Sequence, residues 1–390
     1  MNHWNYIALG DICTVERGGS PRPIDDFITT ESDGVNWIKI GDTDESMYIT
    51  KTAQKIKPEG MKKSRYVKPG DFLLSNSMSF GRPYILKIDG CIHDGWLVLH
   101  DENNVFDKKF LYYYLSAPIT YEKFKSMAVG GVVNNLNSDM VRKIRIPLPS
   151  KKEQHNIADS LDKVTNLIFL RKQQLAKLDE LVKARFVEMF GEPVSNPKHW
   201  KTAFLLDIGY CKNGMNFHKG DSGVDIHCLG VGDFKNRTTI QNVEDLPFVS
   251  LNELPDPEYL LRDNDIIFVR SNGNKELVGR CLAIYPGSIP VTYSGFCIRY
   301  RLTSTNIDTS YLLQVLKTDS IRKKMTGRGA NIQNLNQQTL SQLLVPIPPL
   351  SLQNEFATFA ERVDQQKQTI QQSLEKLELL KKALMQEYFG

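Results

Sequence analysis

The sequence predicts an α+β protein made of two tandem copies of one unit, with pseudo-two-fold internal symmetry. Ile146-Pro-Leu-Pro149, a long amphipathic run and Met189-Phe-Gly191 return 199 residues later as Val345-Pro-Ile-Pro348, a similar run and Tyr388-Phe-Gly390. Self-similarity at one fixed spacing is typical of duplicated structure. Short apolar runs precede each Pro-x-Pro and a heptad pattern follows it. Each copy is therefore predicted to be an α+β unit followed by a long helix.

The starts of the two halves also match, which extends the repeat over most of the chain. The matching residues are Trp4, Leu9, Asp11 and Ile12 against Trp200, Leu205, Asp207 and Ile208, then Ile40-Gly-Asp42 against Val231-Gly-Asp233, and Gly81-Arg82 against Gly279-Arg280. The spacing between these anchors drifts, which indicates loops of different length. We predict a shared framework that carries different polar loops.

Residues 1–145 alternate short apolar runs with turn residues, which predicts strands over 36–40, 71–74, 84–88 and 96–99. Helical spacing follows over 109–127 and is broken once, at Pro118. Residues 200–344 repeat this scheme, with predicted strands over 265–269, 281–285 and 296–300 and a helix over 311–325. We expect Trp37, Trp96 and Phe296 to be core aromatics.

Each Pro-x-Pro segment excludes a regular helix and a central strand, so we predict a stiff extended lead-in to the helix that follows. Ser150-Lys-Lys-Glu153 fits a capping box at the start of the first helix. In the second copy Ser351 takes the capping place and Asn354 replaces the glutamate.

Apolar residues recur along both helices in alternating steps of three and four, which predicts a coiled-coil seam. The seam residues are Ile157, Leu161, Val164, Ile168, Leu175, Leu178, Val182 and Met189 in the first helix, and Phe356, Ala360, Val363, Ile370, Leu374, Leu377, Leu384 and Tyr388 in the second. Both seams are narrow and the remaining faces are charged. We therefore expect the two helices to pair as an antiparallel coiled coil, with Lys381 near Asp159 or Asp162.

The composition limits the function classes. A net charge of +4 is too small to indicate nucleic acid binding by itself. The six cysteines form no Cys-x-x-Cys pair, so neither zinc nor a disulfide framework is indicated. No signal peptide pattern and no run of eighteen apolar residues is present, so we expect a cytoplasmic protein without membrane contact.

Motifs for catalysis are missing. A methyltransferase needs a Gly-rich cofactor loop after a strand and an Asn- or Asp-Pro-Pro-aromatic turn, and the sequence has neither. It also has no Walker lysine motif, and no Glu-x-Lys follows Pro255, Asp256 and Glu258 at the spacing of a nuclease site. We predict a non-catalytic chain with no cofactor or metal of its own.

The order of globular unit, Pro-x-Pro and long helix ending in Phe-Gly, given twice, resembles the specificity subunit of bacterial type I restriction-modification enzymes. The most specific segments are 146–154 with 178–191, and 345–353 with 377–390. The resemblance implies target recognition domains over 1–145 and 192–344, and lead-ins with spacer helices over 146–191 and 345–390. It spans essentially the whole chain.

The same resemblance implies the partners. Each recognition domain would read one half of a split double-stranded DNA target, and the helices would dock two methyltransferase subunits. Those subunits would use S-adenosylmethionine to methylate adenine N6, and restriction subunits that use ATP and Mg²⁺ would join through them. Two alternatives stay open: a standalone sequence-specific DNA-binding scaffold, and a coiled-coil adaptor that does not bind DNA.

Candidate DNA contacts follow from residue chemistry, because cations bind phosphates while amide and guanidinium groups read base edges. Three pairs of segments at similar places in the halves supply such groups: 17–19 with 212–214, 75–82 with 270–275, and 130–135 with 329–334. The candidates are Arg17, Ser75, Asn76, Ser77, Arg82, Lys123, Lys125 and Asn134 in the first half, and Lys212, Arg270, Ser271, Asn272, Lys275, Arg280, Lys323, Arg328 and Asn331 in the second. The alternative is that the short polar residues only form turns and satisfy their own backbone.

Overall fold

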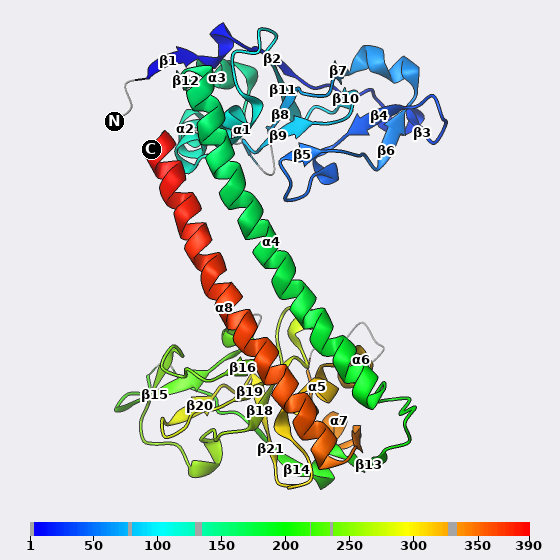
Figure 1. Cartoon of the computed structure of the whole chain (residues 1–390), viewed down its shortest axis with the longest axis vertical. Coiled ribbons are helices and arrows are strands. Elements are labelled where there is room, and N and C mark those ends of the chain that lie inside the picture. The colour runs from blue at the N-terminus through cyan, green and yellow to red at the C-terminus, as the bar shows by residue number, and fades with distance from the viewer. Residues whose placement is uncertain (1–3, 77–79, 129–134, 219, 235–236, 327–333) are drawn as a thin grey trace. The chain divides into compact units, whose positions relative to one another are not determined.

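A computed structural model describes residues 4–76, 80–128, 135–218, 220–234, 237–326 and 334–390. The chain divides into two compact units (Figure 1). Unit 1 comprises residues 1–172 and 372–390, and unit 2 comprises residues 173–371. The two long helices, α4 (Lys151–Phe190) and α8 (Leu350–Phe389), are as predicted, and each contributes one part to each unit.

Unit 1 contains two five-stranded sheets. The strand order of the first is β2 (Thr14–Arg17), β11 (Trp96–His100), β8 (Phe72–Ser75), β9 (Pro83–Leu86) and β5 (Tyr48–Ile49). The order of the second is β3 (Ile28–Thr29), β6 (Gln54–Ile56), β4 (Val35–Ile38), β10 (Gly90–Ile92) and β7 (Arg65–Val67). Side chains alternate between faces along a strand, and in β8 Leu73 packs in the core between the two sheets. Phe72 and Leu74 pack in a second core, beneath the helices.

Helices α1 (Lys108–Ser116), α2 (Pro118–Ala128) and α3 (Ser138–Lys143) cover the outer face of the first sheet. The break at Pro118 is confirmed. Residues of the Pro-x-Pro lead-in form β12 (Arg145–Leu148), which pairs antiparallel with β1 (Asn5–Ala8) in a two-stranded sheet and places Pro147 opposite Tyr6. The lead-in is thus extended and not a central strand, as its prolines predicted.

Unit 2 repeats the topology of the first sheet of unit 1, and its second sheet has fewer strands. Its five-stranded sheet has the order β14 (Gly209–Asn213), β21 (Cys297–Leu302), β18 (Asp265–Val269), β19 (Cys281–Ile284) and β16 (Thr239–Ile240). Its smaller sheet has the order β17 (Phe248–Leu251), β15 (Val224–Leu229) and β20 (Val291–Tyr293), and β13 (Lys201–Phe204) pairs with β22 (Leu344–Ile347). The helices are α5 (Thr309–Lys317), α6 (Asp319–Thr326) and α7 (Gln337–Ser341). The α+β repeat predicted from the sequence is confirmed.

The helix expected over 311–325 is two helices. Thr318 separates them with an extended ψ of 145°. Its backbone N–H and its side-chain hydroxyl both donate to the carbonyl of Val315, at 3.1 and 2.7 Å. A threonine that bonds its own preceding turn ends a helix without the proline that marks the equivalent break in unit 1.

A buried glutamine ties each long helix to its unit. Gln154 Oε1 accepts from the backbone N–H of Asp107 at 2.6 Å, and its Nε2 donates to the carbonyls of Val105 and Pro149. Gln353, which lies 199 residues later, makes the same three contacts in unit 2, to Asp308, Asn306 and Pro348. Each glutamine therefore connects the cap of α1 or α5 with the first turn of α4 or α8.

The first turns of the two long helices differ. Glu153 Oε2 accepts from the backbone N–H of Ser150 at 2.9 Å, and Ser150 Oγ accepts from the N–H of Glu153 at 3.3 Å, which confirms the capping box. The expectation for Ser351 is wrong. Helix α8 begins at Leu350, and the carbonyl of Pro349 accepts from the N–H groups of Leu352 and Gln353.

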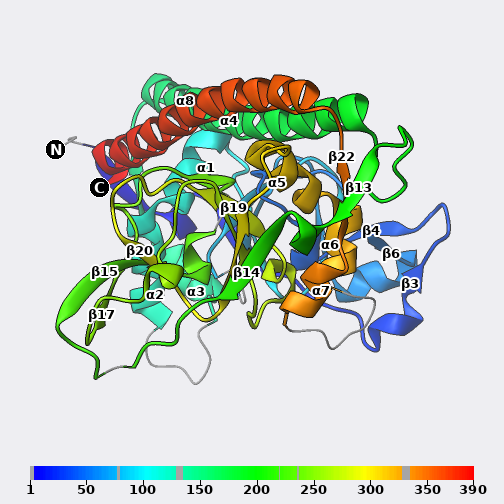
Figure 2. The same ribbon diagram turned by 90° about the horizontal axis from the view of Figure 1, so that it is seen from below.

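Within each unit the segments of α4 and α8 lie side by side and run antiparallel (Figures 1 and 2). In unit 1 Phe389, at the end of α8, shares a core with Ile157 near the start of α4, and Lys172 pairs with Glu378 at 3.5 Å. In unit 2 Arg185 pairs with Glu355 at 2.9 Å. The predicted seam residues are buried or half-buried in both helices.

The neighbour expected for Lys381 is wrong. Burial lowers the pKa of Lys381, and the charge of Lys172 lowers it further while Glu378 opposes the change. Asp162 instead contacts Lys109 and Tyr113, and Asp159 pairs with Lys163. The pairing register of the helices is therefore shifted from the one assumed. Among the helices of the described residues, none is long and apolar enough to cross a bilayer.

Candidate nucleic-acid interface

In each unit, three neighbouring strands have their ends on the same side of one sheet, and the loops that follow or precede them gather there. This is the sheet that contains β2 in unit 1 and β14 in unit 2. In unit 1, β2 ends at Arg17, β8 ends at Ser75 and β11 begins at Trp96; the register pairs Arg17 with Leu97 and Ser75 with Trp96. We call residues 17–22, 76, 93–95 and 135–137 the loop edge of unit 1. The loop edge of unit 2 comprises residues 213–216, 270–272, 294–296 and 334–337.

The same backbone hydrogen bonds build both loop edges. The N–H of Gly18 donates to Trp96 O at 2.9 Å, as the N–H of Gly214 donates to Cys297 O at 3.1 Å. A Cβ at Gly18 or Gly214 would collide with the carbonyl oxygen of His93 or Ser294, so both positions need glycine. The framework that carries the loops is therefore duplicated in detail.

Two further pairs of bonds fix the correspondence. The N–H of Asn76 donates to Gly95 O at 3.0 Å, as that of Arg270 donates to Phe296 O at 2.8 Å. The carbonyls of Asn76 and Arg270 in turn accept from the N–H groups of Leu136 and Leu335. Arg270 thus occupies the place of Asn76, and Phe296 the place of Gly95.

This register corrects one predicted equivalence. The sequence paired Arg17 with Lys212, but Arg17 and Asn213 both directly precede the equivalent glycines, Gly18 and Gly214. Lys212 lies one residue earlier, and its ammonium pairs with Glu258 and lies 4.7 Å from the centre of the Tyr259 ring. Its charge is therefore matched by a carboxylate within unit 2.

Charged side chains gather at the loop edge of unit 1. Arg17 is exposed, and its Nε donates to the carbonyl of Asp94 at 3.1 Å. The Asp94 carboxylate accepts from Ser20 Oγ at 2.9 Å and from Arg22 at 3.3 Å. Burial alone would raise the pKa of Asp94, but these hydrogen bonds and nearby positive charge hold it below its ordinary value. The edge thus presents two arginines and an ionised carboxylate.

The short polar residues at the end of β8 lie inside the fold. Ser75 is fully buried and its Oγ accepts from the N–H of Arg82 at 3.0 Å. Asn76 is also buried, and its Nδ2 donates to the carbonyl of Asp94 at 2.8 Å. These contacts favour the turn-forming alternative for both residues over contact with DNA. Ser77 lies outside the described residues.

Three other candidates of unit 1 do not join the loop edge as a group. Arg82 donates to the carbonyl of Asp44 at 3.1 Å and lies over the ring of Tyr84. Lys123 Nζ lies 3.4 Å from the hydroxyl of Tyr114, while Lys125 is exposed on α2. Asn134 lies outside the described residues.

The structure does bring three candidates together in unit 2. Arg270 donates from its guanidinium to Gly295 O at 3.4 Å, and the N–H of Ser271 donates to Phe296 O at 3.3 Å. Asn272 follows them, and its Oδ1 accepts from the N–H of Asn274. All three lie in the strand-to-loop transition after β18, at the loop edge.

The remaining candidates of unit 2 lie beyond that transition. Arg322 of α6 holds the loop that carries Lys275 and Arg280, by donating to the carbonyls of Glu276 and Val278 at 2.9 and 3.4 Å. Lys323 is exposed on the same helix. Arg328 and Asn331 lie outside the described residues.

Sequence reasoning missed several residues of the loop edges. Trp37 and Trp96 are core residues as expected, but Phe296 is 61% exposed, so that expectation is wrong. Arg22, Asp94 and Asn213 were also missed. Ser294-Gly295 before Phe296 was the available indication, because a glycine in a tight turn places its neighbour outside the sheet.

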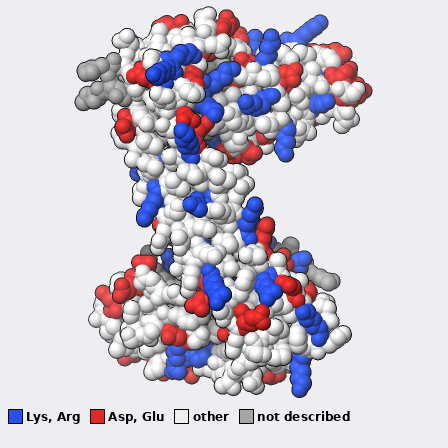
Figure 3. All heavy atoms as spheres, in the orientation of Figure 1, with Lys and Arg blue, Asp and Glu red and all other residues white. Residues whose placement is uncertain are grey.

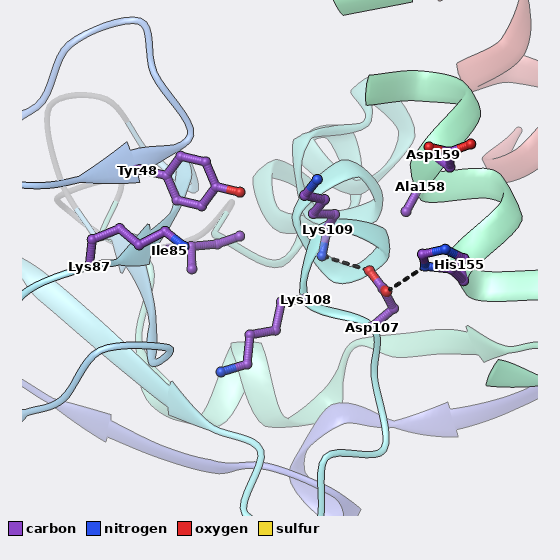
Figure 4. A pocket seen from close by; sticks show the side chains of 9 residues that line it. All are labelled: Tyr48, Ile85, Lys87, Asp107, Lys108, Lys109, His155, Ala158 and Asp159. Carbon is purple, nitrogen blue, oxygen red and sulfur yellow. Dashed lines mark hydrogen bonds and ion pairs between the residues drawn. The ribbon is translucent and has the colours of Figure 1, made fainter. Parts of the chain in front are cut away.

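A cavity of about 330 Å³ in unit 1 lies elsewhere (Figure 4). It is bounded by α1, α4 and the β5 and β9 strands, and Asp107 in its wall caps α1 by accepting from the N–H groups of Lys109 and Phe110. His155 lies 3.5 Å from Asp107. Of the described candidates for DNA contact, none lines this cavity.

Charge is mixed over the visible face of each unit, where lysine and arginine alternate with acidic residues (Figure 3). The described part of the chain contains no group of three or more His, Cys, Asp or Glu side chains placed to hold a metal. The loop edges, where guanidinium, amide and carboxylate groups converge on rigid turns, are therefore the places with chemistry suited to reading base edges.

An ion pair in unit 1, between His100 and Asp71, predicts that the stability of this unit depends on pH. His100 Nδ1 lies 3.0 Å from Asp71 Oδ1 in unit 1. The hydrogen bond with Asp71 raises the pKa of His100 above 6.5, with burial opposing and the charges of Asp71, Glu16 and Glu102 adding. The protonated form therefore stabilises unit 1 below about pH 6.5, and this contribution is lost as pH rises through the raised pKa.

The test compares urea unfolding of the wild-type chain and His100→Gln across that range. We expect the stability difference between them to shrink as pH rises. Taking the difference removes the effect of His93, whose pKa is lowered by burial and which acts in the opposite sense. A difference that does not depend on pH would contradict the prediction.

Comparison with known proteins agrees with this geometry. The model of the type I restriction modification DNA specificity domain matches residues 1–180 and 197–379, one match for each repeat. The StySPI specificity subunit of a type I restriction enzyme from Salmonella potsdam is 27% identical over 271 residues, covering 65% of this chain and 57% of that protein. The MjaVIII specificity subunit from Methanocaldococcus jannaschii is 22% identical over 409 residues, covering 98% and 91%.

Solved structures share the fold. The type I restriction-modification S subunit from M. genitalium has a TM-score of 0.58 at 16% identity, covering 100% of this chain and 97% of that chain. A chain from a study of complex assembly and conformational transition of the type I R-M system has a TM-score of 0.60 at 14% identity, covering 99% and 97%. With both repeats matched by the family model, the chain belongs to the type I restriction-modification DNA specificity family, as a DNA sequence-specificity subunit and not an enzyme.

Proposed function

We propose that the chain reads a split double-stranded DNA target, with one half-site bound at the loop edge of each unit. The observation that carries the proposal is the pair of loop edges themselves. Their backbone hydrogen bonds are the same, while the side chains at equivalent places differ, as Asn76 differs from Arg270 and Gly95 from Phe296. One duplicated framework with two sets of side chains suits the recognition of two different short sequences.

The contacts we assign to DNA are those that lie at the loop edges. In unit 1 these are Arg17 and Arg22, and in unit 2 Arg270, Ser271 and Asn272. Exposed Lys125 and Lys323 are assigned to the phosphate backbone, where a positive charge contributes affinity without sequence preference. The recognition domains proposed are residues 1–145 and 192–344.

The test is an exchange of residues 200–344 for the corresponding domain of another specificity subunit. Modified-base sequencing of a host that carries the chimera, together with its methyltransferase, gives the methylated motif. We expect one half-site to change while the other half-site and the gap stay as they were. A change of both half-sites would contradict separate reading by the two units.

We propose further that the spacer segments, 146–191 and 345–390, dock two methyltransferase subunits. Both helices carry exposed apolar side chains, which a monomeric surface helix rarely collects. They include Leu167, Phe169, Leu170, Leu379 and Leu380 in unit 1, and Leu181 and Val187 in unit 2. Leu181 and Leu380 are equivalent in the repeat and are 47% and 46% exposed, so two like surfaces are available for two like subunits.

In this proposal the partner subunits carry out the reactions on DNA. Each methyltransferase subunit binds S-adenosylmethionine and methylates adenine N6 after the base is flipped from the helix. Restriction subunits, which use ATP and Mg²⁺, join through the methyltransferase subunits. The chain itself holds the DNA and the subunits in register, in the cytoplasm.

The docking proposal makes a prediction for Leu181→Glu and Leu380→Glu. Each variant should lose one methyltransferase subunit, because the docked subunit would cover a carboxylate in place of the exposed leucine, and that carboxylate would have to be desolvated. Native mass spectrometry of the assembled complex should give one subunit for each single variant and none for the double variant. Gln366→Glu, an exposed change on α8, is the control and should keep both. Two subunits on the double variant would contradict the assignment.

A further inference from the structure

Phe296 presents a large apolar side chain to solvent at the loop edge of unit 2. It lies in the turn between β20 and β21, and β21 begins at the next residue. Cys297, the next residue, is fully buried, whereas Phe296 is 61% exposed.

The turn holds Phe296 in a fixed position. The N–H of Cys297 donates to Ser294 O at 2.8 Å, and the N–H of Phe296 donates to Ser294 Oγ at 3.3 Å. The carbonyl of Phe296 accepts from the N–H groups of Arg270 and Ser271. Because these bonds hold the backbone of Phe296, little backbone entropy is lost when the residue makes a contact, so its position is preorganised.

Guanidinium and amide groups, the kinds that read base edges in DNA, lie near Phe296. Arg270 donates its guanidinium to Gly295 O, directly before Phe296. On the adjoining strand, Asn213 Oδ1 accepts from Gln337 Nε2 at 3.4 Å. Guanidinium and amide groups beside an apolar ring match the major-groove edge of DNA, where hydrogen-bonding atoms lie beside the C5 methyl group of thymine.

Unit 1 has no such ring at the equivalent place. The backbone hydrogen bonds put Gly95 where unit 2 has Phe296, and Asp94 where unit 2 has Gly295. The aromatic side chain is therefore not required by the framework, because the same turn forms with glycine. Its presence in one unit only is what a residue that distinguishes the two half-sites would show.

We propose that Phe296 is a specificity-determining residue whose ring packs against the C5 methyl group of a thymine in the half-site read by unit 2. This inference rests on the proposed function, and it adds the chemistry of one base contact. The contact is apolar, so it contributes to the choice of base and not to the attraction between protein and phosphate.

The experiment measures binding of the full chain, assembled with its methyltransferase subunits, to duplexes that carry the methylated motif. Each thymine of the unit 2 half-site is replaced in turn by deoxyuridine, which removes only the methyl group. We expect one replacement to weaken binding of the wild-type complex about fourfold. Phe296→Ala should bind the unmodified duplex as weakly as the wild type binds the modified one, and should lose nothing further on that replacement.

Two controls separate this contact from other effects. Phe204→Ala removes another exposed ring, near the start of β14 and so at the opposite end of that strand from the loop edge, and should keep the full discrimination. The salt dependence of binding should be the same for Phe296→Ala and the wild type, because no phosphate contact is lost. A smaller salt dependence, with equal losses on all sequences, would overturn the assignment.

Failure of the inference and failure of the proposed function give different results. Equal discrimination against deoxyuridine by the wild type and Phe296→Ala, with specific binding intact, overturns only the role of Phe296. A wild-type complex that discriminates at none of the thymines does the same. A complex that binds the motif no better than unrelated DNA contradicts the function itself.

Discussion

Replacing Phe389 with alanine should lower the free energy of unfolding of unit 1 by about 3–5 kcal/mol, the usual cost of removing a buried aromatic ring. The ring is almost fully buried, with its centre 5.7 Å from that of Phe110 and 5.6 Å from that of Tyr114. It fills part of the core where α1 packs against the end of α8 in unit 1.

Urea unfolding followed by a probe in each unit tests this prediction. Phe190→Ala should destabilise unit 2 by a similar amount, because Phe190 is the equivalent residue and packs against Tyr311 at 4.7 Å and Phe356 at 5.6 Å. Phe169→Ala, which removes an exposed ring from α4, is the matched control. A loss of stability for Phe389→Ala no larger than for Phe169→Ala would contradict the packing.

Asp265→Ala should destabilise unit 2 by about 3–5 kcal/mol, because it leaves a largely buried arginine without its carboxylate. Asp265 accepts two hydrogen bonds of 2.7 Å from Nε and NH2 of Arg301, and also one from the N–H of Arg262. Burial by itself would lower the pKa of Arg301, but the hydrogen bonds with Asp265 and its negative charge raise it. The pair joins the start of β18 to β21.

The equivalent pair in unit 1 provides the comparison: Asp71 lies directly before β8 and His100 ends β11, at the places that Asp265 and Arg301 take in unit 2. Arg301→His should give unit 2 the dependence on pH expected for unit 1, and His100→Arg should remove it from unit 1. Chemical denaturation at several pH values measures both. If Asp265→Ala and the Arg301→His variant unfold at the wild-type denaturant concentration, the ion pair contributes nothing and the prediction is wrong.

The sequence was sufficient for the repeat and the long helices, because both depend on periodic patterns that local physics enforces. A constant spacing of 199 residues and a heptad pattern need no knowledge of tertiary contacts. The capping box at Ser150 and the break at Pro118 are also local, since each involves atoms a few residues apart. The fold class followed from these features together with the short apolar runs.

The candidate site was less predictable because it depends on pairing between distant strands. A shift of one residue in register exchanges Lys212 for Asn213 at the loop edge, and no local pattern fixes that register. For Ser75 and Asn76 the sequence left two roles open, because a short polar side chain at the end of a strand can satisfy the turn as well as bind a ligand. Phe296 resembled a core residue because its exposure is set by the turn at Gly295 and not by its own chemistry.

Unit 1 consists of two segments separated by all of unit 2, and this arrangement sets the order in which the units are completed during synthesis. Domains usually form in the order in which the ribosome makes them. Here the segment 173–371, which forms all of unit 2, is complete before residues 372–390 of unit 1 are made, and until then the core of unit 1 lacks the side chain of Phe389. The amino-terminal unit is therefore the last to be finished, and a ribosome that stops early leaves its hydrophobic core open.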